Sequence, residues 1–227
     1  MNIYKIMNIF DKYARNYDLW YEEPFGKSAF KLELDCINKI LNYTNKSIFS
    51  YKSLEIGVGS ARFAQDLKII YGIDTSIELL KLAKKRGVLG ILGKAENLPL
   101  KNLSFDLVLI VVSICFFENP ELALKQVWRI LKEDGNLVIG LILSDSLWGK
   151  FYKEKAKKGH PIYSNAHFYS YSEINSMLIK NNFKIEKIYS TLFENPQDQK
   201  PIENQAIKEG FYKEGGFFCI IAKKSHK

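Results

Sequence analysis

Gly57, Gly59 and Asp74 are the residues whose types and spacing point most directly to chemistry. The two glycines occupy a turn after the apolar run 53–56, and the acid follows a second apolar run at residues 69–73. Glycine allows a sharp backbone turn and lets a ligand approach without meeting a Cβ. A carboxylate after the second strand can accept hydrogen bonds from ribose hydroxyls. We therefore predict that this stretch binds a cofactor that contains a ribose.

Two classes of cofactor are bound by such a turn, the dinucleotides and S-adenosylmethionine. A dinucleotide fingerprint reads GxGxxG or GxGxxA, and its last small residue permits close packing of a helix on a strand. Counted from Gly57, that position holds Arg62, so the dinucleotide pattern fails there. A tight turn that binds no ligand is still an alternative at this point.

Several motifs accompany the turn. Glu55 begins E-x-G-x-G, G-I-D ends at Asp74, A-E-N-L-P follows at 95–99, and S-F-D stands at 104–106. In order and spacing, the region from about Ser53 to Leu143 resembles the class I S-adenosylmethionine-dependent methyltransferases, specifically the methyltransferase type 11 group. The segment FDKYARNYD at 10–18 is similar to the N-terminal segment of many small-molecule methyltransferases of this group, including the quinone C-methyltransferases.

This resemblance implies roles for the residues at the end of the first two strands. Gly57 and Gly59 would meet the methionine part of the cofactor with their backbone. Glu55 would orient its ammonium group, directly or through water, and Asp74 would hold the ribose. Tyr17 would close over the site, because an electron-rich ring attracts a sulfonium cation.

The resemblance also implies roles for residues that follow the third and fourth strands. Ala95 and Glu96 would lie along the adenine ring, and Val112 and Ser113 would border the methionine and the transferable methyl group. Lys94 departs from the family pattern, which often has an aspartate there. The implied cofactor-binding residues are Glu55, Gly57, Gly59, Asp74, Thr75, Ala95, Glu96, Val112, Ser113 and Tyr17.

The methyl acceptor is less clearly indicated. Methyl transfer needs a base only if the acceptor must first lose a proton, and the sequence shows no catalytic dyad. His160 and His167 are weak candidate bases, although a histidine in a polar loop is more often a plain surface residue. The stretch 113–117 lacks the (N/D/S)-P-P-(Y/F) motif of base-amino methyltransferases. We expect transfer to an N, O, S or C atom of a small molecule.

Aromatic side chains are the expected lining of the acceptor pocket, although each of them could instead be part of the core. We name Trp20, Tyr21, Phe116, Phe117, Trp148, Tyr152 and Tyr163. The alternatives that stay open are an RNA or protein methyltransferase and a non-catalytic protein that binds S-adenosylmethionine.

Composition limits the partners and the setting. The formal charge is +8, and lysine supplies nearly all of the positive charge, whereas recognition of nucleic acid favours arginine. Nucleic acid is therefore a less favoured partner than a small-molecule acceptor. The three cysteines form no CxxC pair, so we expect no zinc or other metal site and a cytoplasmic setting. No apolar run is long enough to cross a bilayer, so we expect no membrane partner.

The elements that must position these residues alternate between strands and helices. We expect an α/β fold, a Rossmann-like seven-stranded mostly parallel sheet with an antiparallel last strand and helices on both faces. The run 105–112 is apolar on both faces, as expected of a central parallel strand. Thr75 and Glu78 have the spacing of a helix capping box, and Gly135 is expected to end the helix that begins after Asn119.

We predict a single domain over residues 1–227 with four parts. An N-terminal helical lid covers 1–50, and the cofactor-binding core covers 51–143. A substrate-cap insertion, rich in aromatic residues and lysine, covers 144–171 after the fifth strand. A C-terminal helix and hairpin cover 172–227, with a long polar loop at 194–215 that shows no helical pattern.

Overall fold

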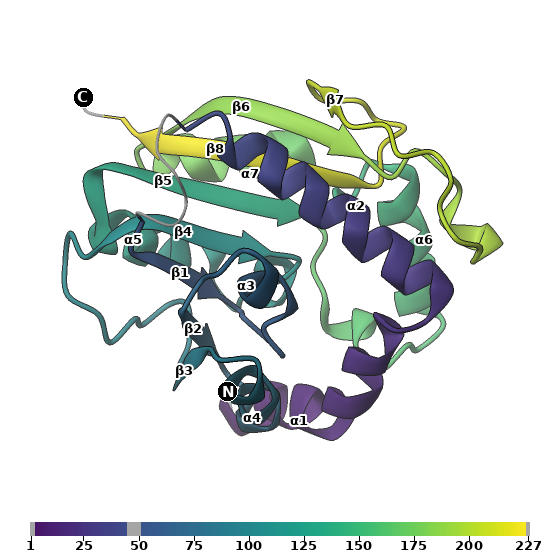
Figure 1. Cartoon of the computed structure of the whole chain (residues 1–227), viewed down its shortest axis with the longest axis horizontal. Coiled ribbons are helices and arrows are strands. Elements are labelled where there is room, and N and C mark those ends of the chain that lie inside the picture. Colours follow the sequence, from purple (N-terminus) through teal and green to yellow (C-terminus); the bar gives the residue numbers. More distant parts are fainter. Residues whose placement is uncertain (1–2, 45–50, 226–227) are drawn as a thin grey trace.

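The computed structural model describes residues 3–44 and 51–225, and for residues 3–8 the backbone alone. Its centre is an eight-stranded sheet with the order β3-β2-β1-β4-β5-β8-β6-β7 (Figure 1). The strands are β1 (Ser53–Ile56), β2 (Tyr71–Asp74), β3 (Leu89–Leu92), β4 (Phe105–Val111), β5 (Leu131–Leu141), β6 (Phe183–Thr191), β7 (Lys208–Glu209) and β8 (Phe217–Lys224).

The strand directions confirm the predicted fold class. Strands β1 to β5 pair in parallel, and β8 lies antiparallel between β5 and β6. The sheet has one strand more than the seven we expected. This extra strand, the two-residue β7, pairs with β6 from within the loop 194–215.

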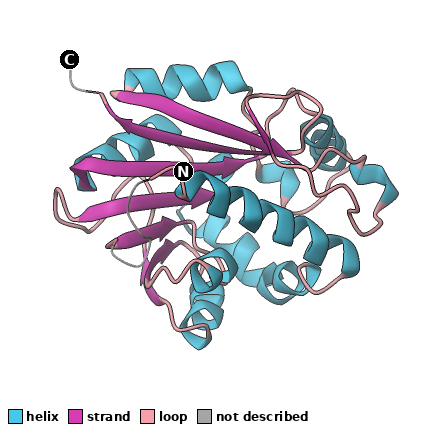
Figure 2. Ribbon diagram, turned by 45° about the horizontal axis from the view of Figure 1, so that its top comes forward, coloured by secondary structure: helices cyan, strands magenta, loops and turns pink. Residues whose placement is uncertain are grey.

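Helices cover both faces of the sheet (Figure 2). Apolar side chains of α2, α3, α4 and α6 pack in one core cluster, and those of α5 and α7 pack in the other. Helix α1 runs beside α4 at one end of the molecule (Figure 1). The helices are α1 (Ile3–Trp20), α2 (Pro24–Leu41), α3 (Arg62–Asp66), α4 (Ile77–Lys85), α5 (Pro120–Ile130), α6 (Leu147–Lys157) and α7 (Tyr171–Lys180).

Strand β4 lies in the middle of the sheet, as its sequence predicts. Leu107 and Leu109 face one core cluster, while Val108 and Ile110 face the other. All four side chains are fully buried. The strand therefore holds its neighbours β1 and β5 in register and fixes where their carboxyl ends lie.

Two predicted helix boundaries are wrong. Helix α4 is capped by Ser76, whose Oγ accepts a hydrogen bond from the Leu79 N–H at 3.2 Å. Glu78 is then one position too close to the cap for a capping box, and its carboxylate pairs with Lys81 at 2.6 Å. Helix α5 ends at Ile130 rather than at Gly135, because the next residue is already extended and begins β5.

Within residues 3–44 and 51–225, no helix combines the length and the hydropathy needed to cross a membrane.

Candidate functional site

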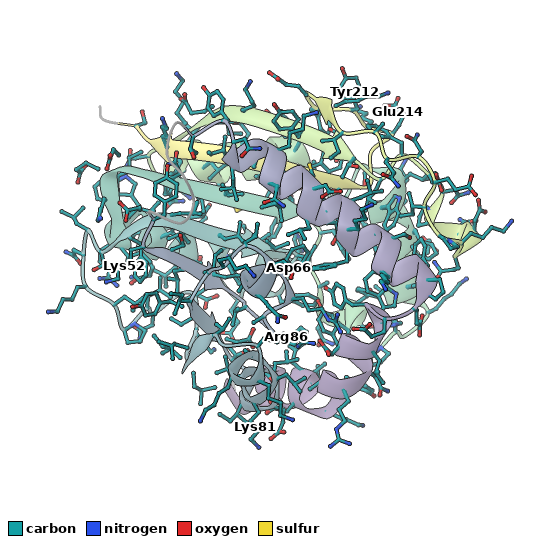
Figure 3. All side chains as sticks on the ribbon, in the orientation of Figure 1. Lys52, Asp66, Lys81, Arg86, Tyr212 and Glu214 are labelled. Carbon is teal, nitrogen blue, oxygen red and sulfur yellow. The ribbon has the colours of Figure 1, made fainter. Side chains whose placement is uncertain are left out.

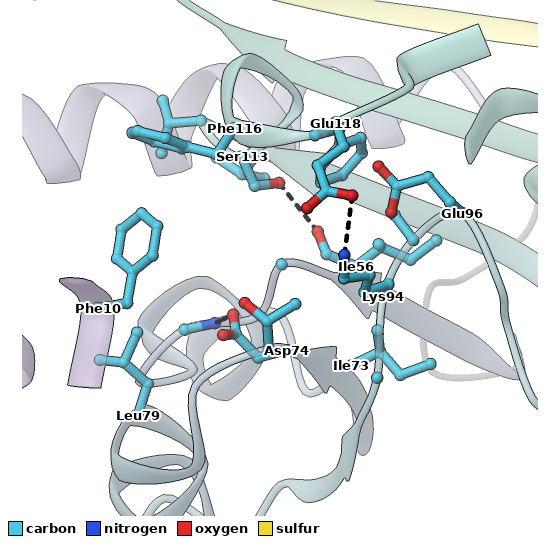
Figure 4. Close-up of a pocket in the computed structure, with 18 of the residues that line it drawn as sticks. Phe10, Ile56, Ile73, Asp74, Leu79, Lys94, Glu96, Ser113, Phe116 and Glu118 are labelled. Carbon is cyan, nitrogen blue, oxygen red and sulfur yellow. Dashed lines mark hydrogen bonds and ion pairs between the residues drawn. The ribbon is translucent and has the colours of Figure 1, made fainter. Parts of the chain in front are cut away.

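A cavity opens at the carboxyl ends of β1, β2 and β4, and we call it the first cavity (Figure 4). Its empty volume is about 790 Å³, part of which is open solvent. It is lined by Phe10, Tyr17, Ile56, Gly57, Gly59, Ile73, Asp74, Thr75, Leu79, Gly93, Lys94, Ala95, Glu96, Val111, Val112, Ser113, Phe116, Phe117 and Glu118. Nine of the ten predicted cofactor-binding residues belong to this lining, and the tenth, Glu55, does not.

The glycine turn after β1 is shaped by close contact with the end of β4. Gly57 and Gly59 have φ angles of +72° and +52°, a region that glycine enters at no steric cost. A Cβ on Gly57 would lie 2.4 Å from the Cβ of Ser113. The Ser113 hydroxyl donates to the Ile56 carbonyl at 3.0 Å, which ties the two strand ends together (Figure 4). The turn therefore presents bare backbone to the first cavity.

Asp74 is held rigidly beside this turn. Its Oδ2 accepts from the Gly59 N–H and its Oδ1 accepts from the Ser76 N–H, both at 2.8 Å. Burial raises the pKa of Asp74, while these backbone hydrogen bonds act in the opposite direction. Each carboxylate oxygen can accept a further hydrogen bond. Asp74 can thus offer one acceptor to each of two neighbouring hydroxyl groups, as a ribose requires.

Glu55 does not line the first cavity. Along β1, Leu54 and Ile56 pack toward α5 and α7, so the side chain of Glu55 points to the opposite face. There its carboxyl accepts from the Ala64 backbone N–H of α3, and burial raises its pKa well above the ordinary value. Its Oε2 has no hydrogen-bond partner in the described part of the chain. The role of Glu55 toward the cofactor, directly or through water, stays a prediction.

The side of the first cavity expected to hold adenine carries charged residues with fixed partners. The Oε1 of Glu96 accepts from the backbone N–H of Asn119, the residue that caps α5, at 3.1 Å. Lys94 pairs with Glu118 at 2.8 Å (Figure 4). The sequence carries no signal for this ion pair, because nothing in the spacing of Lys94 and Glu118 indicates that they meet.

Helix α1 supplies the outer wall of the first cavity. Phe10 packs edge-on against Phe116, with ring centroids 5.0 Å apart. Tyr17 also lines the cavity, as predicted, and burial raises its pKa to about 12. Phe10 was missed, although it is the first residue of the segment FDKYARNYD that the sequence analysis singled out.

An ion-pair network anchors α1 to the glycine turn. Asp18 lies 2.9 Å from Arg62 and 2.9 Å from Arg86, and it accepts from the hydroxyl of Ser60. Despite the opposing effect of burial, these hydrogen bonds lower the pKa of Asp18 to about 2. Because Ser60 directly follows Gly59, the network joins α1 to the cofactor turn itself.

A second cavity, with an empty volume of about 1310 Å³ that includes open solvent, adjoins the first. Its lining is Tyr13, Asn16, Tyr17, Trp20, Tyr21, Glu33, Val112, Ile114, Cys115, Phe116, Leu141, Ile142, Tyr152, His160, Pro161, Ile162, Tyr163, Phe168 and Tyr169. Tyr17, Val112 and Phe116 line both cavities. The two cavities therefore lie next to each other near the end of β4.

Five of the seven aromatic residues predicted for the acceptor pocket line the second cavity, and two do not. Phe117 lines the first cavity instead. Trp148 is fully buried in the core, where its ring stacks on Phe25 at 5.6 Å and its N–H donates to the Glu194 carbonyl. An aromatic residue of α6 can face either the core or the second cavity, and the sequence does not reveal which face of the helix meets the cavity.

The two candidate histidines differ in position. His160 lines the second cavity, and burial together with the nearby charge of Lys155 lowers its pKa. His167 is exposed, lines neither cavity and packs on Tyr169. Between the two, only His160 is placed to meet a ligand in either cavity.

Glu33 was also missed, and it is the acidic residue that lines the second cavity. It lies on α2 and is 4% exposed. The sequence contains a signal for it, because Glu33 falls at helical spacing from Phe30 and Ile37, on the apolar stripe of the helix. A charged residue on an apolar stripe is a candidate for a buried functional role.

Comparison with known proteins yields one family. Residues 54–139 match the family described as methyltransferase domain. An uncharacterized protein of Methanocaldococcus jannaschii is 39% identical over 218 residues, which cover 96% of this chain and 100% of the relative. The demethylmenaquinone methyltransferase of Thermotoga maritima is 31% identical over 142 residues, 59% of each chain.

A solved structure extends the likeness to nearly the whole chain. It is a Thermotoga maritima protein described as a SAM-dependent methyltransferase and possible histamine N-methyltransferase. It is 36% identical, covers 97% of this chain and 100% of its own, and has a TM-score of 0.86. The bare glycine turn and the fixed carboxylate of Asp74 suit the cofactor of that family. The chain therefore belongs to the S-adenosylmethionine-dependent methyltransferases, which use S-adenosylmethionine as the methyl donor.

Proposed function

We propose that this chain methylates a small-molecule acceptor bound in the second cavity, with S-adenosylmethionine bound in the first. The observation that supports this most directly is that the two cavities lie side by side, since Tyr17, Val112 and Phe116 line both of them. The methyl donor and the methyl acceptor would meet where these three residues lie.

The roles proposed for the cofactor-binding residues follow from the contacts in the first cavity. The backbone of Gly57 and Gly59, which lines the cavity, would meet the methionine part, and Asp74 would accept hydrogen bonds from the two ribose hydroxyls. Ala95 and Glu96 border the adenine ring. Thr75, Val112 and Ser113 complete the lining around the ribose and the methionine.

S-adenosylmethionine supplies an electrophilic methyl group, so the residues of the chain mainly have to align an acceptor atom and exclude water. Holding two reactants in line can lower the activation barrier by about 7–11 kcal/mol. Phe10 and Tyr17 cover the first cavity from α1, and this covering would exclude water. His160 would act as a base only if the acceptor must lose a proton before it is methylated.

Two further observations favour a small acceptor. Residues 152, 160–163 and 168–169, all from the predicted substrate cap, line the second cavity, which supports the role proposed for 144–171. The Thermotoga relatives are described by the names of small molecules, demethylmenaquinone and histamine. An RNA or protein acceptor would instead need an open surface beside the first cavity.

Calorimetric titration with S-adenosylhomocysteine tests the cofactor site. We expect binding to the wild type and at least tenfold weaker binding to Asp74→Ala, which corresponds to about 1.4 kcal/mol or more. Asp66→Ala serves as the matched control, because Asp66 is an exposed acid of α3 (Figure 3). Equal affinities of wild type and Asp74→Ala would contradict the proposed role of Asp74. Absence of binding to the wild type would contradict the proposed function.

The acceptor part of the proposal is tested by screening small molecules for methyl transfer. We expect turnover that Phe168→Ala lowers while S-adenosylhomocysteine still binds, because Phe168 lines the second cavity and not the first. Methylation of RNA or protein but of no small molecule would instead favour a macromolecular acceptor. Cofactor binding without turnover on any acceptor would favour a non-catalytic protein.

A further inference from the structure

Glu33 is a buried carboxyl without a partner in the lining of the second cavity. It is 4% exposed. In residues 3–44 and 51–225, neither a hydrogen bond nor an ion pair to its side chain is present, and burial is the cause of its raised pKa. A buried charge without a partner is costly. A carboxyl in this position is explained if a ligand in the cavity supplies the missing partner.

The surroundings of Glu33 are aromatic and carry little charge. Tyr17, Tyr21 and Tyr152 lie near enough for the charge of Glu33 to raise their pKa values. Lysine and arginine side chains are absent from the described lining of this cavity. The titratable groups that face the same space are Tyr13, Tyr17, Tyr21, Cys115, Tyr152, His160, Tyr163 and Tyr169.

The same burial sets the charge of Glu33 in the free protein. Desolvation raises its pKa to about 8, so the carboxyl is mostly neutral at pH 7. A cation that enters the cavity would favour the ionised carboxylate and lower this pKa again. Aromatic faces attract the same cation, whereas an anion would meet no positive lysine or arginine in the described lining.

We propose that the methyl acceptor carries a basic nitrogen, and that the carboxylate of Glu33 binds this nitrogen as an ammonium group among the aromatic rings of the second cavity. This inference rests on the proposed function, because it names the class of acceptor for that same cavity. It assigns Glu33 to binding and leaves open which atom of the acceptor receives the methyl group.

Pairing of an ammonium ion with Glu33 should also displace a proton. When an ammonium ion pairs with Glu33, the proton held by the carboxyl in the empty cavity must leave for solvent. With a pKa of about 8 in the free protein, binding at pH 7 should release roughly 0.9 of a proton. The released proton is measured by calorimetry in two buffers with different ionisation enthalpies. A neutral or anionic ligand gives no such release from Glu33.

The probes are matched trios that share one skeleton and differ in one group: 2-phenylethylamine, 2-phenylethanol and phenylacetate, with the same trio on indole, imidazole and straight alkyl skeletons. Each is titrated into protein saturated with S-adenosylhomocysteine. We expect amines to bind at least tenfold more tightly than the alcohols and acids, with release of about one proton at pH 7. Glu33→Gln should weaken amine binding at least tenfold and abolish the proton release. It should leave the affinity for S-adenosylhomocysteine unchanged.

Glu214→Gln is the control, because Glu214 is an exposed acid on the surface (Figure 3), and it should behave as wild type. The proposal is overturned if no amine of the panel binds, if amines bind no better than alcohols, or if Glu33→Gln retains amine binding with proton release. Failure of this proposal is distinguishable from failure of the proposed function. If S-adenosylhomocysteine binds and a neutral acceptor is methylated, the function stands and the role of Glu33 does not.

Discussion

Replacing Glu33 with glutamine should make the protein more stable at alkaline pH and leave it about equally stable in acid. The pKa of Glu33 is raised from its ordinary value of 4.5 to about 8, because the folded protein buries the carboxyl. The folded state therefore binds a proton more tightly than the unfolded chain. Stability contributed by the neutral carboxyl is fully present below about pH 4.5 and is lost as pH rises through about 8.

The magnitude follows from the two pKa values. At about 1.4 kcal/mol for each pKa unit, wild type should lose at most about 5 kcal/mol between pH 4 and pH 9 through Glu33 alone. Glutamine has nearly the same shape and no proton to lose. The difference in unfolding free energy between Glu33→Gln and wild type should therefore grow with pH and level off above about pH 8.

Urea unfolding followed by tryptophan fluorescence measures this difference at pH values from 4 to 9. Other groups with raised pKa values, such as Asp74 and Glu55, are present in both proteins and cancel in the comparison. Glu214→Gln is the exposed control and should track wild type throughout. Parallel curves for Glu33→Gln and wild type would refute the reasoning, since they would show that Glu33 ionises normally in the folded protein.

Two further substitutions test the architecture of the site. Gly57→Ala should destabilise the fold by about 1–3 kcal/mol and weaken binding of S-adenosylhomocysteine, because its Cβ would meet Ser113 at 2.4 Å; thermal unfolding unchanged from wild type would contradict this. Asp18→Asn should cost about 1–3 kcal/mol, because Arg62 and Arg86 lose a charged partner. Proteolysis within α1 should become faster in that variant, and an unchanged cleavage rate would show that the network does not hold the helix.

Local patterns predicted the elements well, because their signals depend on near neighbours in the chain. Asn119 caps α5 and Pro120 follows as its first residue, as the dipeptide indicates. The alternation of strands and helices along the chain predicted the parallel sheet, and the hairpin at its end predicted the antiparallel β8. Two boundaries failed. Ser76, next to Thr75, caps α4, and the chain is already extended at Leu131, before Gly135.

The sequence by itself determined the cofactor turn. Gly57, Gly59 and Asp74 are held together by two adjacent parallel strands, so their order in the chain is enough to bring them to one edge. Only the tertiary structure decided which distant side chains face the cavities. Glu55 contacts α3 and does not line the first cavity, and Trp148 is buried in the core. Glu33 stands out in the sequence as a charge on an apolar helix stripe, but the sequence does not show what that stripe faces. Phe10 and Glu33 line the two cavities because α1 packs beside α4 and α2 packs on β6 and β8, and contacts between elements far apart in the chain are not specified by local spacing.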